Sequence, residues 1–158
     1  MLDQTPVQIA WVTRDLDATE KALTTLLGAK KWIRMAGVHF GPDTCTYRGR
    51  PADFVADVSF SYAGATQLEL IAPVSGESIY TDFLDSVGPG LHHICIEADD
   101  LGRALAERDA VVVQRGLMPG GLEFAYVSAE AAGVPYIEIA YISPKIRAFF
   151  DHVKQEQQ

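Results

Sequence analysis

The sequence has few cysteines and no long apolar run. Only Cys45 and Cys95 occur among 158 residues, too few for a disulfide framework. Cys95 stands in an apolar run that is typical of a small buried hydrophobic residue, so we expect reduced thiols and a cytoplasmic protein. No apolar stretch approaches the roughly 20 residues that cross a bilayer. The N-terminus lacks a basic start followed by an apolar run, so we expect no signal peptide.

Basic residues are also scarce. Lysine and arginine total 13 against 21 acidic residues, and the net charge is -8. Binding to nucleic acid or to an anionic membrane needs basic patches that neutralise phosphates, so neither is expected as the main partner. A small-molecule substrate remains compatible with this charge. Because 48% of the residues are hydrophobic, we expect one compact soluble domain.

An internal repeat is the strongest signal in the chain. The segment QIAWVTRDLDATEKAL from Gln8 aligns without gaps with HICIEADDLGRALAER from His93. Each copy begins with a strand-like apolar run and passes through an Asp-Leu pair into a helical pattern. Asp at such a boundary can cap the free N–H groups of the first turn.

The elements that follow are punctuated by turn residues. Leu16, Leu23, Leu26 and Leu27 share one face of the first helix, which Gly28 ends, and the second helix runs from Leu101 to Arg108. Strands are expected over 30–35, 54–62, 66–72, 110–116, 122–127 and 136–142.

Each half of the chain therefore reads β-α-β-β-β. We expect an α+β fold over residues 1–158, with module one at about 6–73, a linker helix at about 77–88, module two at about 90–143 and a tail helix over 144–158. From Gln8 to Glu69 is 61 residues, and from His93 to Glu138 is 45. The 16 extra residues of the first half fall around 38–53, which we expect to be a long, functional loop.

Four polar residues occupy equivalent places in the two modules. Alternation along a strand puts Gln8 on the face of Ala10 and Val12, and repeat alignment pairs Gln8 with His93 and Glu69 with Glu138. If the modules pair about a pseudo-two-fold axis, all four side chains point into one cavity.

Each of these residues also has a simpler interpretation. Gln8 alone is typical of a strand end, Glu69 and Glu138 can face solvent from half-buried strands, and His93 beside His92 can be a core histidine. Their coincidence at repeat-equivalent positions favours a shared site, because buried carboxylates need a partner or a metal. One nitrogen and three oxygen donors suit a divalent metal with open positions, such as Zn, Mn, Co, Ni or Mg.

At these residues the sequence resembles the vicinal oxygen chelate superfamily of glyoxalases, bleomycin-resistance proteins and dioxygenases. The resemblance rests on the run from Gln8, QLELIAP from Gln67, GLHHICIEADDL from Gly90 and PYIEIAYI from Pro135. The run from Gly90 is closest to the methylmalonyl-CoA epimerase branch, and the ligand set is similar to that of some glyoxalase I enzymes. The resemblance implies two βαβββ modules that form a curved mixed sheet around a metal, and a homodimer.

The resemblance also implies an isomerase, epimerase or lyase that abstracts a proton next to a carbonyl. The metal ligands would be Gln8, Glu69, His93 and Glu138, and Glu138 or Glu69 would be the base, with Glu138 favoured. The acidic segment that supplies one epimerase base is not recognisable after the second strand, so methylmalonyl-CoA is not assigned as the substrate. Candidate pocket residues are His39, Arg48, Arg50, Cys95 and Tyr136.

Two other functions remain open. One is a small-molecule sequestration protein of the antibiotic-resistance type, which would need no metal. The other is a metal-dependent lyase or hydrolase that acts on a hydrophobic cyclic substrate. The metal content of the protein distinguishes the first of these from the enzymes.

Overall fold

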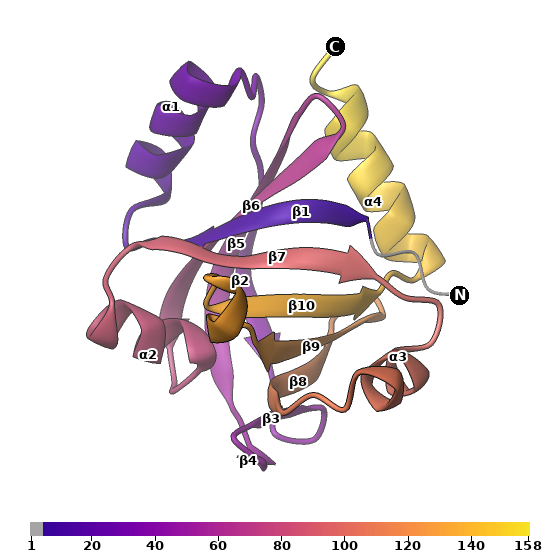
Figure 1. Cartoon of the computed structure of the whole chain (residues 1–158). Coiled ribbons are helices and arrows are strands. Elements are labelled where there is room, and N and C mark those ends of the chain that lie inside the picture. The colour runs from indigo at the N-terminus through magenta and orange to yellow at the C-terminus, as the bar shows by residue number, and fades with distance from the viewer. Residues whose placement is uncertain (1–4) are drawn as a thin grey trace.

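A ten-stranded mixed sheet curls around the core of the protein in the computed structural model, which describes residues 5–158 (Figure 1). Residues 1–4, at the start of the predicted domain, lie outside the described part. The elements in chain order are β1 (Pro6–Val12), α1 (Leu16–Leu27), β2 (Ile33–Phe40), β3 (Cys45–Tyr47), β4 (Arg50–Pro51), β5 (Phe54–Ala63), β6 (Thr66–Ser75), α2 (Ile79–Ser86), β7 (Gly90–Glu97), α3 (Leu101–Arg108), β8 (Val112–Met118), β9 (Leu122–Ser128), a 3-10 turn (Glu130–Ala132), β10 (Tyr136–Tyr141) and α4 (Pro144–Gln155).

The sheet joins two equivalent halves, as the repeat predicts. The strand order is β2-β5-β6-β1-β7-β10-β9-β8-β3-β4, with β1 parallel to β6 and β7 parallel to β10. The order β2-β5-β6-β1 in the first half thus corresponds to β8-β9-β10-β7 in the second, and the two sets meet at the antiparallel β1–β7 pair. The α+β class and the curved mixed sheet are therefore confirmed.

The pairing of β1 with β7 locates the pseudo-two-fold axis. Ile9 lies opposite Ile94, and these are the two residues that the repeat alignment makes equivalent. On either side, Gln8 faces Cys95 and Ala10 faces His93. A rotation that exchanges the two strands therefore carries Gln8 onto His93.

The helices begin and end where their sequence signals indicate. The Asp15 carboxylate accepts a hydrogen bond from the Ala18 backbone N–H, and Asp100 caps α3 in the same way through Arg103. Gly28 ends α1 with a φ of 77°, a left-handed conformation that glycine adopts without a steric penalty.

The leucine face of α1 is buried only over the first part of the helix. Leu16 and Leu23 are buried against Leu70, but Leu26 and Leu27 are exposed. The apolar cluster under α1 reaches only as far as Leu23, so the last turn of the helix has no part of the sheet to cover.

Half of the predicted long loop is strand. β2 continues to Phe40, and β3 and β4 form a short hairpin within the stretch 38–53. The hairpin pairs with β8, with Cys45 opposite Gly116, so it extends the sheet of the other module. This partner is distant in the sequence, which is why local composition predicts a loop.

The C-terminal helix α4 packs over one end of the curled sheet. Phe150 is buried against Phe60, with ring centroids 5.3 Å apart. Figure 1 shows α4 alongside β6 and β1 on the side of the sheet opposite α1 and α2. Within residues 5–158 no helix is long and apolar enough to span a membrane.

Candidate metal centre

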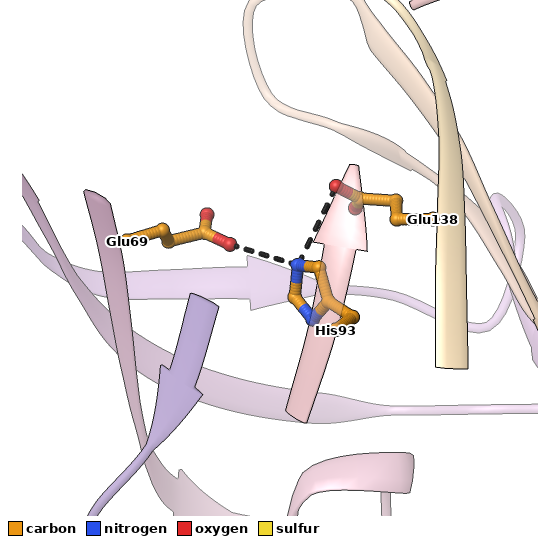
Figure 2. Close-up of side chains that lie close together, drawn as sticks. All are labelled: Glu69, His93 and Glu138. Carbon is orange, nitrogen blue, oxygen red and sulfur yellow. Dashed lines mark ion pairs between the residues drawn. The ribbon is translucent and has the colours of Figure 1, made fainter. Parts of the chain in front are cut away.

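Two glutamates and one histidine from separate strands come together, and both carboxylates approach the same nitrogen of the histidine ring. His93 Nε2 on β7 lies 3.3 Å from Glu69 Oε1 on β6 and 3.6 Å from Glu138 Oε1 on β10. Figure 2 shows the two carboxylates approaching this nitrogen from different sides. His93 is fully buried and Glu138 nearly so, so the cluster lies inside the protein.

Gln8 completes the cluster from β1. Its Oε1 lies 3.2 Å from His93 Nε2, and its Nε2 donates a 2.6 Å hydrogen bond to Gln67 Oε1. Gln67 in turn donates to the Tyr62 hydroxyl at 3.2 Å. This chain of bonds fixes the Gln8 amide with its oxygen toward the cluster.

The spacing of these atoms suits a shared metal ion. Bonds of about 2.0–2.2 Å at angles between 90° and 109° separate neighbouring ligand atoms by about 2.8–3.6 Å. The three oxygens stand 3.2, 3.3 and 3.6 Å from His93 Nε2. The donor atoms of Glu69, His93 and Glu138 all lie within 4.8 Å of one another. The residues therefore fit a divalent cation.

The balance of donors and acceptors leads to the same conclusion. Three oxygens surround one nitrogen, which carries at most one hydrogen. Within residues 5–158 the buried Glu69 Oε1 has no hydrogen-bond partner, because its approach to His93 is close but poorly directed. Leaving such a buried oxygen unpaired is costly, and a cation would satisfy it.

Burial shifts the protonation equilibria of all three groups. It raises the pKa of Glu69 to about 8 and lowers that of His93 to about 4, the latter opposed by Glu138. Burial also raises the pKa of Glu138, against the effect of neighbouring His93. Without a cation the cluster therefore favours neutral side chains, and binding a metal would displace protons.

The two carboxylates differ in their support. Cys95 and Tyr126 lie close enough to Glu138 to oppose the rise of its pKa by hydrogen bonding, and the Tyr126 hydroxyl lies 2.6 Å from that of Tyr80. Tyr126 stands directly opposite Glu138 in the β9–β10 pairing. Glu138 is thus favoured in its ionised form by its neighbours, whereas Glu69 is not.

His92 contacts His93 at Nδ1, the ring nitrogen that does not face the carboxylates. The Nδ1 atoms of the two rings lie 2.8 Å apart, so a single hydrogen between them forms a hydrogen bond. With His93 Nε2 facing a cation, that hydrogen belongs on His93 Nδ1 and is donated to His92. Tyr136 packs on the His92 ring at 4.9 Å, which fixes its plane.

The cluster opens into a cavity of about 220 Å³ inside the curled sheet. Gln8, Glu69, Glu138 and Cys95 line it, and His93 is buried at its wall. Much of the remaining lining is aromatic or aliphatic. Of the five candidate pocket residues, Cys95 lies in this lining.

The other candidate pocket residues lie elsewhere. His39 is exposed and pairs with Asp53 at 2.6 Å, and Arg50 is exposed on β4. Arg48 stacks on the Tyr47 ring and borders a surface hollow with Tyr136. None of these side chains lines the cavity that contains Glu69 and Glu138.

Sequence reasoning missed the residues that support the ligands. Gln67 shares a strand face with Glu69, which is a signal for its role beside Gln8. Tyr126 carries no such signal, because only the pairing of β9 with β10 brings it to Glu138.

The family model for the Glyoxalase/Bleomycin resistance protein/Dioxygenase superfamily matches residues 7–126. The chain belongs to this superfamily. A relative from Bacillus subtilis strain 168, the uncharacterised protein YqjC, is 31% identical over 88 residues, which cover 52% of this chain and 63% of the relative. The match thus spans less than two thirds of that relative.

Solved structures share the superfamily fold. Methylmalonyl-CoA epimerase from Mycobacterium tuberculosis aligns with a TM-score of 0.63 and 21% identity, covering 94% of this chain and 97% of the epimerase. A Streptomyces coelicolor methylmalonyl-CoA epimerase variant in complex with 2-nitronate-propionyl-CoA gives 0.60 and 16%, covering 92% and 98%. At these identities the likeness concerns the fold, and the activity must be argued from the site.

Proposed function

We propose that this superfamily member is a metal-dependent isomerase, epimerase or lyase that abstracts a proton next to a carbonyl. The observation that carries the proposal is the convergence of Gln8, Glu69, His93 and Glu138 at the wall of a cavity. A divalent metal held by these residues, with Zn, Mn, Co, Ni or Mg as candidates, would supply a Lewis acid for the enolate oxygen.

The protein's own residues would bind and deprotonate the substrate. Glu138 is our candidate for the base, because it lines the cavity and because Cys95 and Tyr126 beside it favour its ionised form against the effect of burial. Glu69 is a second candidate, favoured by the absence of any hydrogen bond to its buried oxygen within residues 5–158. A carboxylate with few bonds can turn toward a substrate at little cost.

The first test concerns the metal. Protein purified without chelators should hold close to one equivalent of a divalent ion, and Co²⁺ loading should give an absorption spectrum that His93→Ala abolishes. Less than about a tenth of an equivalent, with no uptake of added Zn, Mn, Co or Ni, rules out a metal enzyme. It would leave the sequestration protein, whose ligand the cavity would hold.

The second test concerns the base. Exchange of a carbonyl-adjacent proton in D₂O, followed by NMR, should be abolished in Glu138→Gln while the fold and metal content persist. The compounds to try are methylmalonyl-CoA, the glutathione hemithioacetal of methylglyoxal and neutral α-hydroxyketones. Full exchange in Glu138→Gln together with loss in Glu69→Gln transfers the role of base to Glu69.

A further inference from the structure

The cavity beside the metal-ligand candidates has a lining that restricts what can enter it. Its buried wall includes three phenylalanines and two other large apolar residues from three strands and α4. These are Phe40, Phe124, Phe150, Met118 and Leu122. Such a wall stabilises apolar ligand surface in proportion to the area removed from water.

Charged lining residues fall into two groups. Glu69 and Glu138 belong to the metal-ligand cluster, and the other four are Glu97 on β7 and Arg147, Asp151 and Lys154 on α4. Arg147 is paired with Glu97. Lys154 stacks over the Tyr62 ring at 5.9 Å. Arg147 and Lys154 are both on α4, and both side chains are exposed to solvent at the edge of the cavity.

The charges balance without a charged ligand. Two carboxylates offset one divalent cation. The two α4 cations equal the acids Glu97 and Asp151 in number, and Arg147 forms an ion pair with Glu97. A substrate carboxylate inside the cavity would meet no free buried cation among the described residues. Its desolvation would go uncompensated.

The volume limits the size of the ligand. An apolar cavity of about 150 Å³ holds benzene. The 220 Å³ found here has room for a ring with substituents, but not for a large polycyclic molecule.

From this lining we propose that the substrate is an uncharged, largely apolar molecule about the size of a substituted six-membered ring. Its oxygens face Gln8, Glu69, His93 and Glu138, and its apolar body packs against Phe40, Phe124 and Phe150. This inference rests on the proposed function, since it takes the cluster to be the reaction centre.

Three hydroxamic acids test the inference on the Zn²⁺-loaded protein. Acetohydroxamic, benzohydroxamic and 4-carboxybenzohydroxamic acid share one chelating group and differ in the group attached to it. Calorimetry should show that the benzo compound binds at least about tenfold tighter than the aceto compound, because its ring is buried. The carboxylated ring should lose that gain. Equal affinity of the first two, or undiminished binding of the carboxylated compound, overturns the proposal.

Blocking variants locate the bound ring. Ala56 lines the cavity and is fully buried, so Ala56→Leu should remove the preference for the benzo compound and retain acetohydroxamate binding. Ala65 lines the opening from an exposed turn, so Ala65→Trp gives the same test without strain in the core. Ala148→Trp, at an exposed α4 position outside the cavity lining, is the matched control and should bind like the wild type. Unchanged preference in both blocking variants contradicts the proposal.

Toluene binding to the metal-free protein distinguishes failure of the proposed function from failure of the substrate assignment. If toluene raises the melting temperature but no hydroxamate binds in a metal-dependent way, the proposed function fails and the substrate assignment fails with it. If all three hydroxamates bind alike and toluene does not bind, the metal centre stands and the apolar substrate class is rejected.

Discussion

Glu69 is a carboxylate whose buried environment disfavours the ionised form. It lies among buried groups, its Oε1 accepts no hydrogen bond within residues 5–158, and its pKa rises to about 8. An unfolded glutamate ionises near its ordinary value of about 4.3, so folding and ionisation oppose each other at this residue. Two predictions follow from this conflict, one for stability and one for metal binding.

We expect the metal-free protein to lose stability between pH 6.5 and pH 8. In this interval the folded Glu69 keeps a proton that the unfolded chain has released, so the free energy of unfolding falls as pH rises, by up to about 1.4 kcal/mol per pH unit. Buried neutral His93, whose pKa is about 4, has the opposite dependence, but that lies below the unfolded histidine value of about 6.5. Urea unfolding with a chelator present measures the change.

The control for this experiment is Glu69→Gln, which keeps the shape and removes the ionisation. Its stability should depend less on pH in the same interval. A wild-type protein whose stability rises from pH 6.5 to pH 8 contradicts the assignment of a raised pKa to Glu69.

Metal affinity should increase with pH up to about 8. The cation must displace the Glu69 proton below that pH, so the association constant should rise by as much as about tenfold per pH unit. Calorimetry in buffers of different ionisation enthalpy counts the protons released. An affinity that is constant from pH 6 to pH 8, with no proton release, would contradict a Glu69 side chain that is protonated before the ion binds.

At the scale of elements, the β3–β4 hairpin is an addition that links the modules. It comes from module one and pairs with β8 of module two. The approach is close at Gly116, where an added Cβ would lie 2.9 Å from Cys45 Sγ and 3.0 Å from Phe124 Cζ. Phe124 lines the cavity, so the hairpin also supports the cavity wall.

Gly116→Ala should destabilise the protein by about 1–3 kcal/mol, because both neighbours of the new methyl group are buried and must move. Denaturant unfolding measures this change. Gly102→Ala in α3 is the matched control, since its Cβ would meet only Asp100 Oδ1 at 3.7 Å and alanine favours helix. Equal stability of the two variants would mean that the hairpin is loosely packed against β8.

At the scale of the whole molecule, the candidate metal centre connects the two halves. Gln8 and Glu69 come from the first module, and His93 and Glu138 come from the second. A bound cation therefore restrains the pairing of β1 with β7 as well as the local side chains. A ligand that binds only the folded state stabilises it by RT ln(1 + L/Kd), where L is the free ligand concentration, so the free energy of unfolding should rise with the logarithm of the metal concentration above Kd.

The predicted homodimer remains to be measured. Light scattering coupled to size exclusion should give twice the chain mass of 17.2 kDa. Exposed Leu26 on α1 is apolar surface that an interface can bury. A mass of one chain at micromolar concentration contradicts the prediction.

The sequence by itself determined the repeat, the fold class and the equivalence of Gln8 with His93 and of Glu69 with Glu138. These features can be predicted because strand alternation and helix capping depend on residues that are neighbours in the sequence. Asp15 and Asp100, for example, cap their helices as the Asp-Leu pairs predict. The ligand candidates could be named because each stands at the same place in the local strand pattern of its copy, although 61 residues separate Gln8 from Glu69 and 45 separate His93 from Glu138.

Only the tertiary structure decided what surrounds those residues. The pairing of β3 with β8, the placement of Tyr126 opposite Glu138 and the cover that α4 provides bring together segments that lie apart in the chain. The same contacts left His39, Arg48 and Arg50 outside the cavity and lined it with apolar side chains. Which side chains share a cavity depends on how the sheet curls, and the curl arises from long-range pairing that no local pattern encodes.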